Sequence, residues 1–466
     1  MKKVVDYLKP YRVFIAIAMI FVFLYAMGNL YLPTLMSEIV NKGVVNQDMD
    51  AVWQYGRRML LVTIAAAFCT LSATFIASKV SASFGRDLRL GVYSKIQTFS
   101  LNEFNKIQTS SLITRTTNDV MQMQHLTLMM IRMMIQAPMM CIGGIIMAVS
   151  KNVQLSILFI VVIPLLLIAI TLLAKKIIPL FTEIQNKTDK INKVIREKLT
   201  GVRVIRAFGT EKYEGERYDK ANKDIYDSSL KAAYIMSTMF PLVMFIINIS
   251  TVAVLWFGSR LIGDGVLQIG DMMAFMQYAM QVLFSILMVT MLFIMIPRAM
   301  VSAKRVNEVL TIDPSVKDNN VEIEKTPNPG EIEFKDVVFS YNHSGEPVLN
   351  NLNFKITKGE TVAIMGGTGS GKSTLLNLML RFYDTTSGEI TIGGLPIKDI
   401  SIKSLRNMIG YVPQKVTLFS GSIAENIKYG KEDASQEDLI KAAKISQAYD
   451  FISSLDEGFE SKVAQG

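Results

Sequence analysis

Eight residues in the C-terminal third of the chain have the types and spacing that bind phosphate groups. Gly366–Ser373 fits the pattern Gly-x-x-x-x-Gly-Lys-Ser/Thr without a mismatch. Glycines let the backbone turn tightly and aim successive N–H groups at one anion. Lys372 can reach the β- and γ-phosphates of a nucleotide, and the Ser373 hydroxyl is a ligand for Mg²⁺. The predicted site comprises Gly366, Gly367, Thr368, Gly369, Ser370, Gly371, Lys372, Ser373 and Thr374.

The segments on either side favour a phosphate site over a chance match in a glycine-rich turn. Thr361–Met365 is apolar and predicts a buried strand, whereas Thr374–Leu380 predicts a helix. A loop between a strand and a helix presents its N–H groups at the positive end of the helix dipole. The expected ligands are therefore ATP and Mg²⁺.

Long apolar segments occupy the first ~300 residues. Half of the 466 residues are hydrophobic. A helix needs about 20 apolar residues to cross a hydrocarbon layer of about 30 Å. Buried helices of a soluble domain are the alternative, but six such segments, each nearly free of charge, favour membrane spans. The predicted spans are Val13–Leu35, Leu60–Ala77, Leu126–Val149, Leu155–Ala174, Tyr234–Phe257 and Met273–Ile296.

Basic residues predict the orientation of these spans. Lys2 and Lys3 precede the first span, and the segments after the second and fourth spans are rich in Lys and Arg. The alternate loops are short and carry few basic residues, with Arg57 and Arg58 as a discordant pair. The positive-inside rule places both termini in the cytoplasm and the protein in the plasma membrane. The net charge of +9 fits this bias, and no nucleic-acid partner is expected.

The two basic segments predict helices rather than loops. Ile184, Ile191 and Ile195 recur at helical spacing, and few Gly or Pro residues interrupt either stretch. Spans two to five are expected to continue into the cytoplasm as helices for about 30–37 Å. Each helix pair must turn at a distal tip, near Ser111–Asp119 in one case and near Phe208–Tyr213 in the other.

The C-terminal part of the chain has the pattern of a soluble α/β domain. Residues 311–330 have the composition of a linker. Short alternating or apolar segments then predict strands, and the phosphate loop and its helix lie between them. This order predicts a parallel sheet with an antiparallel edge. The predicted strands are Glu331–Tyr341, Asn351–Ile356, Thr361–Met365, Glu389–Gly394 and Met408–Gln414.

Together these motifs resemble an ABC exporter half-transporter over essentially the whole chain. The resemblance implies an α-helical bundle of six transmembrane helices (1–310), a linker (311–330) and an α/β nucleotide-binding domain of the P-loop type (331–466). Within this family, the chain resembles the bacterial heterodimeric multidrug exporters. Besides the phosphate loop, the resemblance rests on Phe339–Tyr341, Thr385–Ile390, Tyr411–Gln414, Leu418–Ile427, Ser111–Val120 and Gly201–Phe208.

The resemblance implies roles for further residues. Tyr341 would stack on adenine, although a core tyrosine at a strand end is the alternative. Gln414, with Ser373, would contact Mg²⁺, and it would also contact the attacking water. The two tips would be coupling helices, or else ordinary solvated turns. The signature motif, the catalytic carboxylate and the switch histidine are expected beyond Gly466, so the domain is expected to be incomplete and no catalytic residue is named.

The resemblance implies ATP-driven export of amphipathic compounds by a dimer in a lipid bilayer. A heterodimer with a second half-transporter is expected. A lipid or peptide exporter would share every motif quoted. Two other classes stay open, namely a regulatory subunit that binds ATP at a degenerate site and an ATP-gated channel.

Overall fold

The computed structural model describes residues 2–319, 321–323, 326–341, 345–414, 416–431 and 433–463. It divides into two compact units, which are considered separately. The first comprises residues 1–99 and 103–314, and the second comprises residues 100–102 and those from 315 onwards. Residues 320, 324 and 325 of the expected linker, and 464–466 of the expected C-terminal domain, lie outside the described residues. The limits 1–310, 311–330 and 331–466 stay predictions.

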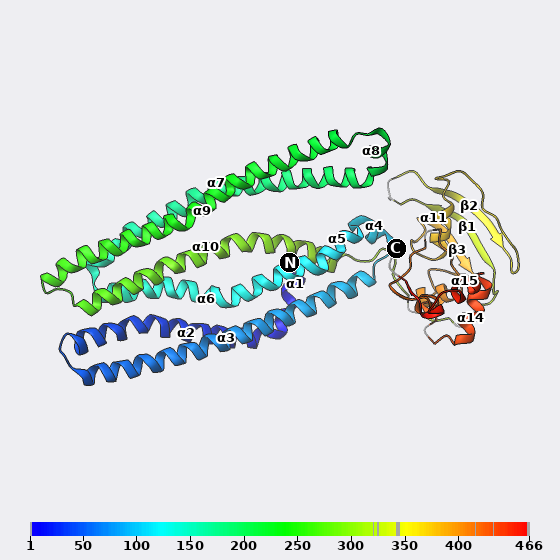
Figure 1. Cartoon of the computed structure of the whole chain (residues 1–466). Coiled ribbons are helices and arrows are strands. Elements are labelled where there is room, and N and C mark those ends of the chain that lie inside the picture. The colour runs from blue at the N-terminus through cyan, green and yellow to red at the C-terminus, as the bar shows by residue number, and fades with distance from the viewer. Residues whose placement is uncertain are drawn as a thin grey trace. The chain divides into compact units, whose positions relative to one another are not determined.

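Six long helical segments build the first unit (Figure 1). Helices α2 and α3 contact each other along their length, as do α7 and α9 and also α6 and α10. A core of apolar side chains, including the stacked rings of Phe159 and Phe275, joins α2, α6, α7, α9 and α10. The helices are α1 (Lys2–Asp6), η1 (Lys9–Tyr11), α2 (Arg12–Glu38), the π-helical η2 (Ile39–Val44), α3 (Met49–Gln97), α4 (Leu101–Ile107), α5 (Thr109–Thr114), the π-helical η3 (Arg115–Asp119), α6 (Val120–Lys151), α7 (Val153–Thr200), α8 (Val202–Phe208), α9 (Glu211–Gly263) and α10 (Ile269–Thr311).

The surface of this unit suits a hydrocarbon solvent. In the most apolar window of each long helix, only 17–38% of residues are buried. Side chains such as Leu71, Phe75 and Ile160 are largely exposed. A soluble protein rarely exposes apolar surface on this scale, whereas a bilayer covers it. All six predicted spans fall within these helices, so the prediction of six spans is confirmed.

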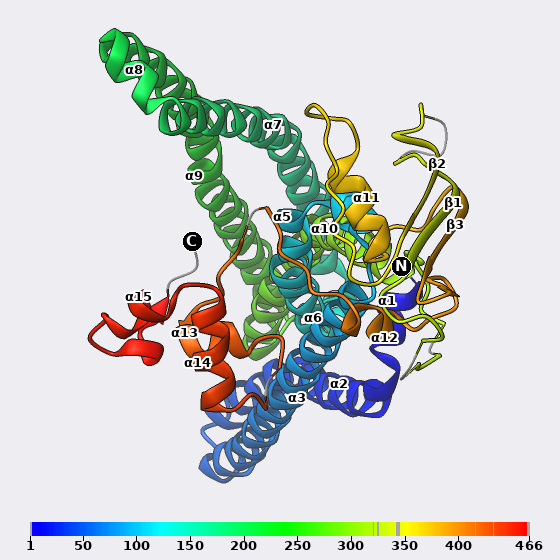
Figure 2. The ribbon, with the colours of Figure 1, turned by 90° about the vertical axis from the view of Figure 1, so that its right-hand side faces the viewer.

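The helices extend well beyond a membrane, as predicted. Helix α7 has 48 residues, which at 1.5 Å per residue give about 72 Å, more than twice a hydrocarbon thickness of about 30 Å. The tip between α7 and α9 is α8, which ends at Gly209 in the left-handed conformation (Figure 2). That location agrees with the prediction. The other tip was predicted at Ser111–Asp119, and this is wrong, because the chain turns at Thr98–Ser100 and residues 109–119 lead into α6.

The second unit contains a four-stranded antiparallel sheet of order β2-β1-β3-β4. Strand β1 pairs with β2 and β3, and Phe334 of β1 stacks on Phe354 of β2 at 4.4 Å. Leu375 and Leu378 of α11 join the apolar core beneath the sheet. The elements are β1 (Ile332–Phe339), β2 (Leu349–Ile356), α11 (Lys372–Met379), β3 (Ser387–Ile392), β4 (Leu395–Pro396), α12 (Ile402–Asn407), β5 (Gly421–Ser422), α13 (Ile423–Lys428), α14 (Gln436–Ile445), α15 (Tyr449–Ser453), η4 (Gly458–Glu460) and β6 (Lys462–Val463).

Three of the five predicted strands are present, and the parallel part of the predicted sheet is not. Thr361–Met365 and Met408–Gln414 form no strand, and Met365 and Val412 are 91% and 90% exposed. An interior strand needs a hydrogen-bonded neighbour on each side. Within the described residues, no strand pairs with either segment, so apolar sequence alone does not make them strands. The antiparallel edge is the part of the sheet prediction that is confirmed.

A partly buried polar cluster joins the ends of three spans. Lys151 Nζ lies 2.7 Å from Asp271 Oδ1, which also accepts a hydrogen bond from Ser37 Oγ at 2.6 Å. Asn41 Oδ1 accepts from the backbone N–H of Gly270 at 2.7 Å. These contacts tie α2 and η2 to α6 and α10, next to the short loops. The partly buried carboxylate of Asp271 is tolerated here because a cation and a hydroxyl both contact it.

We expect Lys151→Met to lower the free energy of unfolding by about 2 kcal/mol, because it leaves the Asp271 carboxylate without a cation. Thermal unfolding in detergent measures the loss. The control is Lys42→Met, since Lys42 pairs with Glu38 one helical turn away and is 56% exposed. That variant should lose less than about 0.5 kcal/mol. Equal losses in the two variants would contradict a structural role for this polar cluster.

Candidate nucleotide-binding site

The phosphate loop lies on the surface of the second unit. Residues 366–370 are exposed, and Ser370 N donates to Gly367 O at 3.3 Å in a tight turn. Gly369 and Gly371 have φ values of 86° and 89°, which glycine adopts without strain. A Cβ atom at Gly369 would meet nothing within 4 Å. The backbone is therefore open on the side where a large anion would approach.

Helix α11 begins directly after this loop, as predicted. Gly371 is its N-cap residue, and Leu375 N donates to Gly371 O at 3.0 Å. The N–H groups of the first turn have no carbonyl partner within the helix and carry the positive end of its dipole. This arrangement fits the phosphates of a nucleotide.

Lys372 is held against the loop that precedes it. Its Nζ donates to the carbonyl oxygens of Gly366 at 2.8 Å and Gly367 at 2.6 Å. The ammonium group thus lies at the loop, where it can contact an anion. Ser373 is exposed, and in the described part of the chain its Oγ has no hydrogen-bond partner. A free hydroxyl at this position fits a Mg²⁺ ligand.

Tyr341 is brought to the first turn of α11 from the end of β1. Its hydroxyl lies 2.9 Å from Thr374 Oγ1. The ring contacts Phe339 and Tyr383 edge to face, at 4.9 and 5.2 Å between centroids, and the residue is 44% exposed. The ring contacts are those of a core tyrosine, and the exposed part of the ring is available for stacking on a nucleotide base. The sequence alone could not show that Tyr341 and Thr374, which are 33 residues apart, are in contact.

Gln414 is a predicted site residue for which no contact with the loop is described. Its side chain is exposed, and no described contact joins it to Ser373. The following residue, 415, lies outside the described part of the chain. The assignment of Gln414 to Mg²⁺ stays a prediction.

Arg381 is a positioning residue that the sequence analysis missed. It is 4% exposed, and its guanidinium donates to the carbonyl oxygens of Lys317, Ile397 and Ile400. Its Nε lies 3.0 Å from Asp384 Oδ1. It thereby fixes the segment after α11. The only signal in the sequence is a charge immediately after an apolar helix, with an Asp three residues later.

Glu360 stabilises the turn that leads into the loop segment. Its carboxylate accepts hydrogen bonds from Thr357 N at 2.9 Å and Thr357 Oγ1 at 3.1 Å. The backbone bond first, and then the hydroxyl bond, lowers the pKa of the Glu360 carboxyl from its ordinary value. Any stabilisation is therefore present above the unfolded pKa and is lost as the pH falls through the folded pKa.

A second candidate site lies between α6 and α10 in the membrane unit. It is a pocket of about 200 Å³, and three of its residues are methionines. Gln281 Nε2 donates to Asn29 O at 3.2 Å, while Gln281 Oε1 is buried with no hydrogen-bond donor among the described residues. The pocket is thus apolar with one unused acceptor beside it. It is lined by Gln136, Met140, Met280, Gln281, Phe284, Ser285 and Met288.

Comparisons with known proteins agree with both units. Residues 15–287 match the model of the ABC transporter transmembrane region, and residues 349–464 match that of the ABC transporter. The chain belongs to the ABC transporter family. It is therefore a multi-pass membrane protein whose nucleotide-binding domain binds ATP, and the family makes it an ATP-hydrolysing transporter that acts as a dimer in a lipid bilayer.

Several relatives align over nearly the whole chain. An uncharacterised ABC transporter ATP-binding protein of Mycobacterium tuberculosis, MT1311, is 36% identical over 99% of this chain and 80% of its own length. YfiB of Bacillus subtilis, named in the same way, is 36% identical over 100% of this chain and 81% of its own length. An ATP-dependent lipid A-core flippase of Desulfotalea psychrophila is 30% identical over 98% of this chain and 80% of its own length. The expectation of an incomplete domain finds no support in these comparisons.

We expect Gly371→Ala to lower the stability of the nucleotide-free protein by about 1–3 kcal/mol, because a Cβ would be forced into a left-handed backbone. The added atom would also lie 2.7 Å from Leu349 Cδ2. Thermal unfolding of the second unit within the full chain measures the effect. Gly367→Ala is the control, since its Cβ would meet nothing within 4 Å. If both variants unfold alike, backbone conformation is not what requires Gly371.

Proposed function

We propose that this chain is one half of a heterodimeric exporter that moves amphipathic compounds out of the cytoplasm with energy from ATP. The observation that carries the proposal is a phosphate loop, with its lysine and serine in place, on the same polypeptide as six membrane spans. The distribution of basic residues supports cytoplasmic termini, which puts the loop where ATP is available.

The proposed nucleotide contacts come from this chain's own groups. Loop N–H groups and Lys372 would hold the phosphates, and Tyr341 would stack on the adenine. Ser373 and Gln414 would hold Mg²⁺, which supplies charge neutralisation between the β- and γ-phosphates. The free hydroxyl of Ser373 supports the metal assignment.

The pocket between α6 and α10 supports an amphipathic substrate. Methionine side chains are flexible and polarisable, so they adapt to apolar ligands of different shape. The unused acceptor of Gln281 adds one polar contact for a ligand that carries an N–H or O–H group. A lipid exporter is the second candidate, because a relative with 30% identity is named as a lipid A-core flippase.

Transport into proteoliposomes that contain this chain and its partner separates these candidates. An amphipathic dye and a fluorescent short-chain lipid are tested side by side with ATP. Movement of the dye supports a multidrug exporter, whereas movement of the lipid alone favours a flippase. If ATP moves neither compound, and single-channel conductance appears in a planar bilayer, the export proposal is wrong.

We expect Lys372→Ala to weaken ATP binding by this chain about 10–100-fold, because a charged hydrogen bond to phosphate contributes about 1.5–3 kcal/mol. Labelled-nucleotide binding and ATP-driven transport are both measured. Lys403→Ala is the control, since Lys403 is an exposed lysine of the same unit, in α12. Unchanged binding in Lys372→Ala would refute the site. Weaker binding with undiminished transport would favour a regulatory subunit.

Two substitutions of Tyr341 test the adenine contact. Tyr341→Phe keeps the ring and loses the hydrogen bond to Thr374, whereas Tyr341→Ala loses both. If the ring stacks on adenine, Tyr341→Ala should weaken ATP binding about fivefold, and Tyr341→Phe should bind nearly normally. Thermal unfolding shows whether either variant is destabilised. Equal affinities for ATP and for inorganic triphosphate in the unaltered protein would indicate a purely structural tyrosine.

A further inference from the structure

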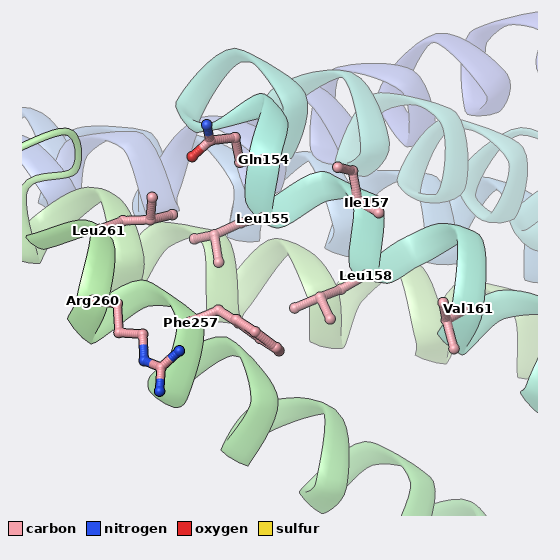
Figure 3. Close-up of a pocket in the computed structure, with 8 residues that line it drawn as sticks. All are labelled: Gln154, Leu155, Ile157, Leu158, Val161, Phe257, Arg260 and Leu261. Carbon is pink, nitrogen blue, oxygen red and sulfur yellow. The ribbon is translucent and has the colours of Figure 1, made fainter. Parts of the chain in front are cut away.

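The pocket drawn in Figure 3 is an apolar groove of about 350 Å³ between α7 and α9. A ligand site usually places a few polar groups so that they converge on one ligand. The two polar side chains of this groove, Gln154 and Arg260, point apart (Figure 3). The groove therefore specifies no ligand. Polar groups do converge in the second unit, around the side chain of Arg381.

Arg381 has a backbone conformation that is unusual for a residue with a side chain. It follows the C-cap residue of α11 with a φ value of 50°, in the left-handed region where glycine is the usual residue. Arg381 N donates to Leu378 O at 3.0 Å. Phe382 N donates to Asn377 O at 2.9 Å, which completes a Schellman motif at the end of the helix. A strained residue of this kind persists where its surroundings hold it in place.

A second helix of the same unit ends with the same backbone and shows what the Arg381 side chain adds. At the end of α14, Gln447 has a φ value of 58°, and its N–H donates to Lys444 O at 3.2 Å. Ala448 N donates to Ala443 O at 2.8 Å. Gln447 is exposed, and within the described residues its side chain forms no hydrogen bond. The two helix ends therefore differ in the contacts of one side chain.

The Arg381 guanidinium joins three segments of the second unit. Its Nη2 donates to Lys317 O at 2.9 Å, in the segment that follows α10. Its Nη1 donates to Ile397 O and Ile400 O, both at 3.3 Å, between β4 and α12. The third segment is the end of α11, to which Arg381 itself belongs. A guanidinium has five N–H donors in fixed directions, so it can hold several carbonyl groups at once.

Residues 316–319 of the expected linker, called the strap below, are fixed to the same segments by further contacts. Val316 is buried. Asp318 Oδ1 accepts a hydrogen bond at 3.0 Å from the backbone N–H of Ile402, the first residue of α12. Asn319 Nδ2 donates to Lys398 O. The strap is thus a fixed part of the second unit and does not behave as a loose linker.

A short stretch of chain separates the strap from the first unit. Ile312 directly follows α10 and packs against an apolar core that includes Val306 and Val309. Three residues lie between Ile312 and Val316, and this stretch spans at most about 14 Å when fully extended. One of the three is Pro314, whose ring restricts the backbone further. The strap therefore cannot move far unless the end of α10 follows.

We propose that Arg381 couples the nucleotide site to the membrane spans by making the strap move with α11. A phosphate group held at the start of α11 fixes the whole helix, because its eight residues span only about 12 Å. Arg381, just after the other end of the helix, carries the strap, and the strap carries the end of α10. Arg381 touches no nucleotide in this scheme and is a positioning residue. Its role rests on the proposed nucleotide site and extends that site to the regulation of transport.

The test compares the unaltered dimeric transporter in nanodiscs with Arg381→Gly and Gln447→Gly. Glycine relieves a left-handed backbone in both variants, and only Arg381→Gly removes contacts to the strap. ATP should slow hydrogen exchange in the phosphate loop of all three proteins, and it should change exchange in residues 303–316 of all but Arg381→Gly. ATP binding by Arg381→Gly should weaken less than about twofold, whereas ATP-driven transport should fall about tenfold or more.

Two substitutions of Asp318 test the strap without altering α11. Asp318 is exposed, so neither change should prevent folding. Asp318→Ala removes the acceptor for Ile402 N and should reduce the response of residues 303–316 to ATP. Asp318→Asn keeps an oxygen acceptor and should respond as the unaltered protein does. Should Arg381→Gly fail to fold, Asp318→Ala decides the question, and an undiminished response in that variant overturns the coupling role.

The outcomes separate the coupling role from the nucleotide site on which it rests. If ATP does not bind the unaltered protein, the proposed site is itself wrong. If ATP binds but leaves residues 303–316 of the unaltered protein unchanged, or if their response persists in Arg381→Gly, the coupling role is wrong. Loss of ATP binding in Arg381→Gly would make Arg381 part of the nucleotide site and would also overturn a separate coupling role.

Discussion

The absence of water in a lipid bilayer is the constraint on which this structure depends. Each backbone N–H and C=O group must find its partner within the protein, and a continuous helix satisfies all of them locally. The six long helices meet this requirement while most of their side chains stay unburied in the chain itself. At the ends of two spans, Lys151 and Asp271 form an ion pair, and Asp271 also accepts a hydrogen bond from Ser37.

The same helices also determine how the part of the first unit beyond the spans is built. Because α7 and α9 continue without a break from the spans, the short helix α8 at their tip is fixed to the membrane part by two long, mutually packed helices. A helix of this length transmits displacement better than a flexible loop would. The prolines within α7, at Pro164 and Pro179, are points where such a helix can bend.

The nucleotide site differs from the spans because most of its residues are close together in the sequence. A phosphate loop is defined by backbone conformation and by the start of one helix, so nine consecutive residues contain most of its chemistry. Two contacts complete it from a distance. The Tyr341 hydroxyl meets Thr374, and Arg381 ties the segment after α11 to three carbonyl groups. The first contact joins the start of α11 to the segment that follows β1.

The sequence by itself determined the features that depend on short-range patterns. The length of the apolar segments was sufficient to predict the six spans. Alternating or apolar patterns predicted strand β1 (Ile332–Phe339) and its neighbours β2 and β3, and the spacing of glycines predicted the loop before α11. Only the tertiary structure decided whether Thr361–Met365 and Met408–Gln414 pair as strands, where the chain turns after α3, and that the Tyr341 hydroxyl meets Thr374. Strand pairing and contacts such as that between Tyr341 and Thr374 require partners that are distant in the chain, and no local pattern specifies those partners.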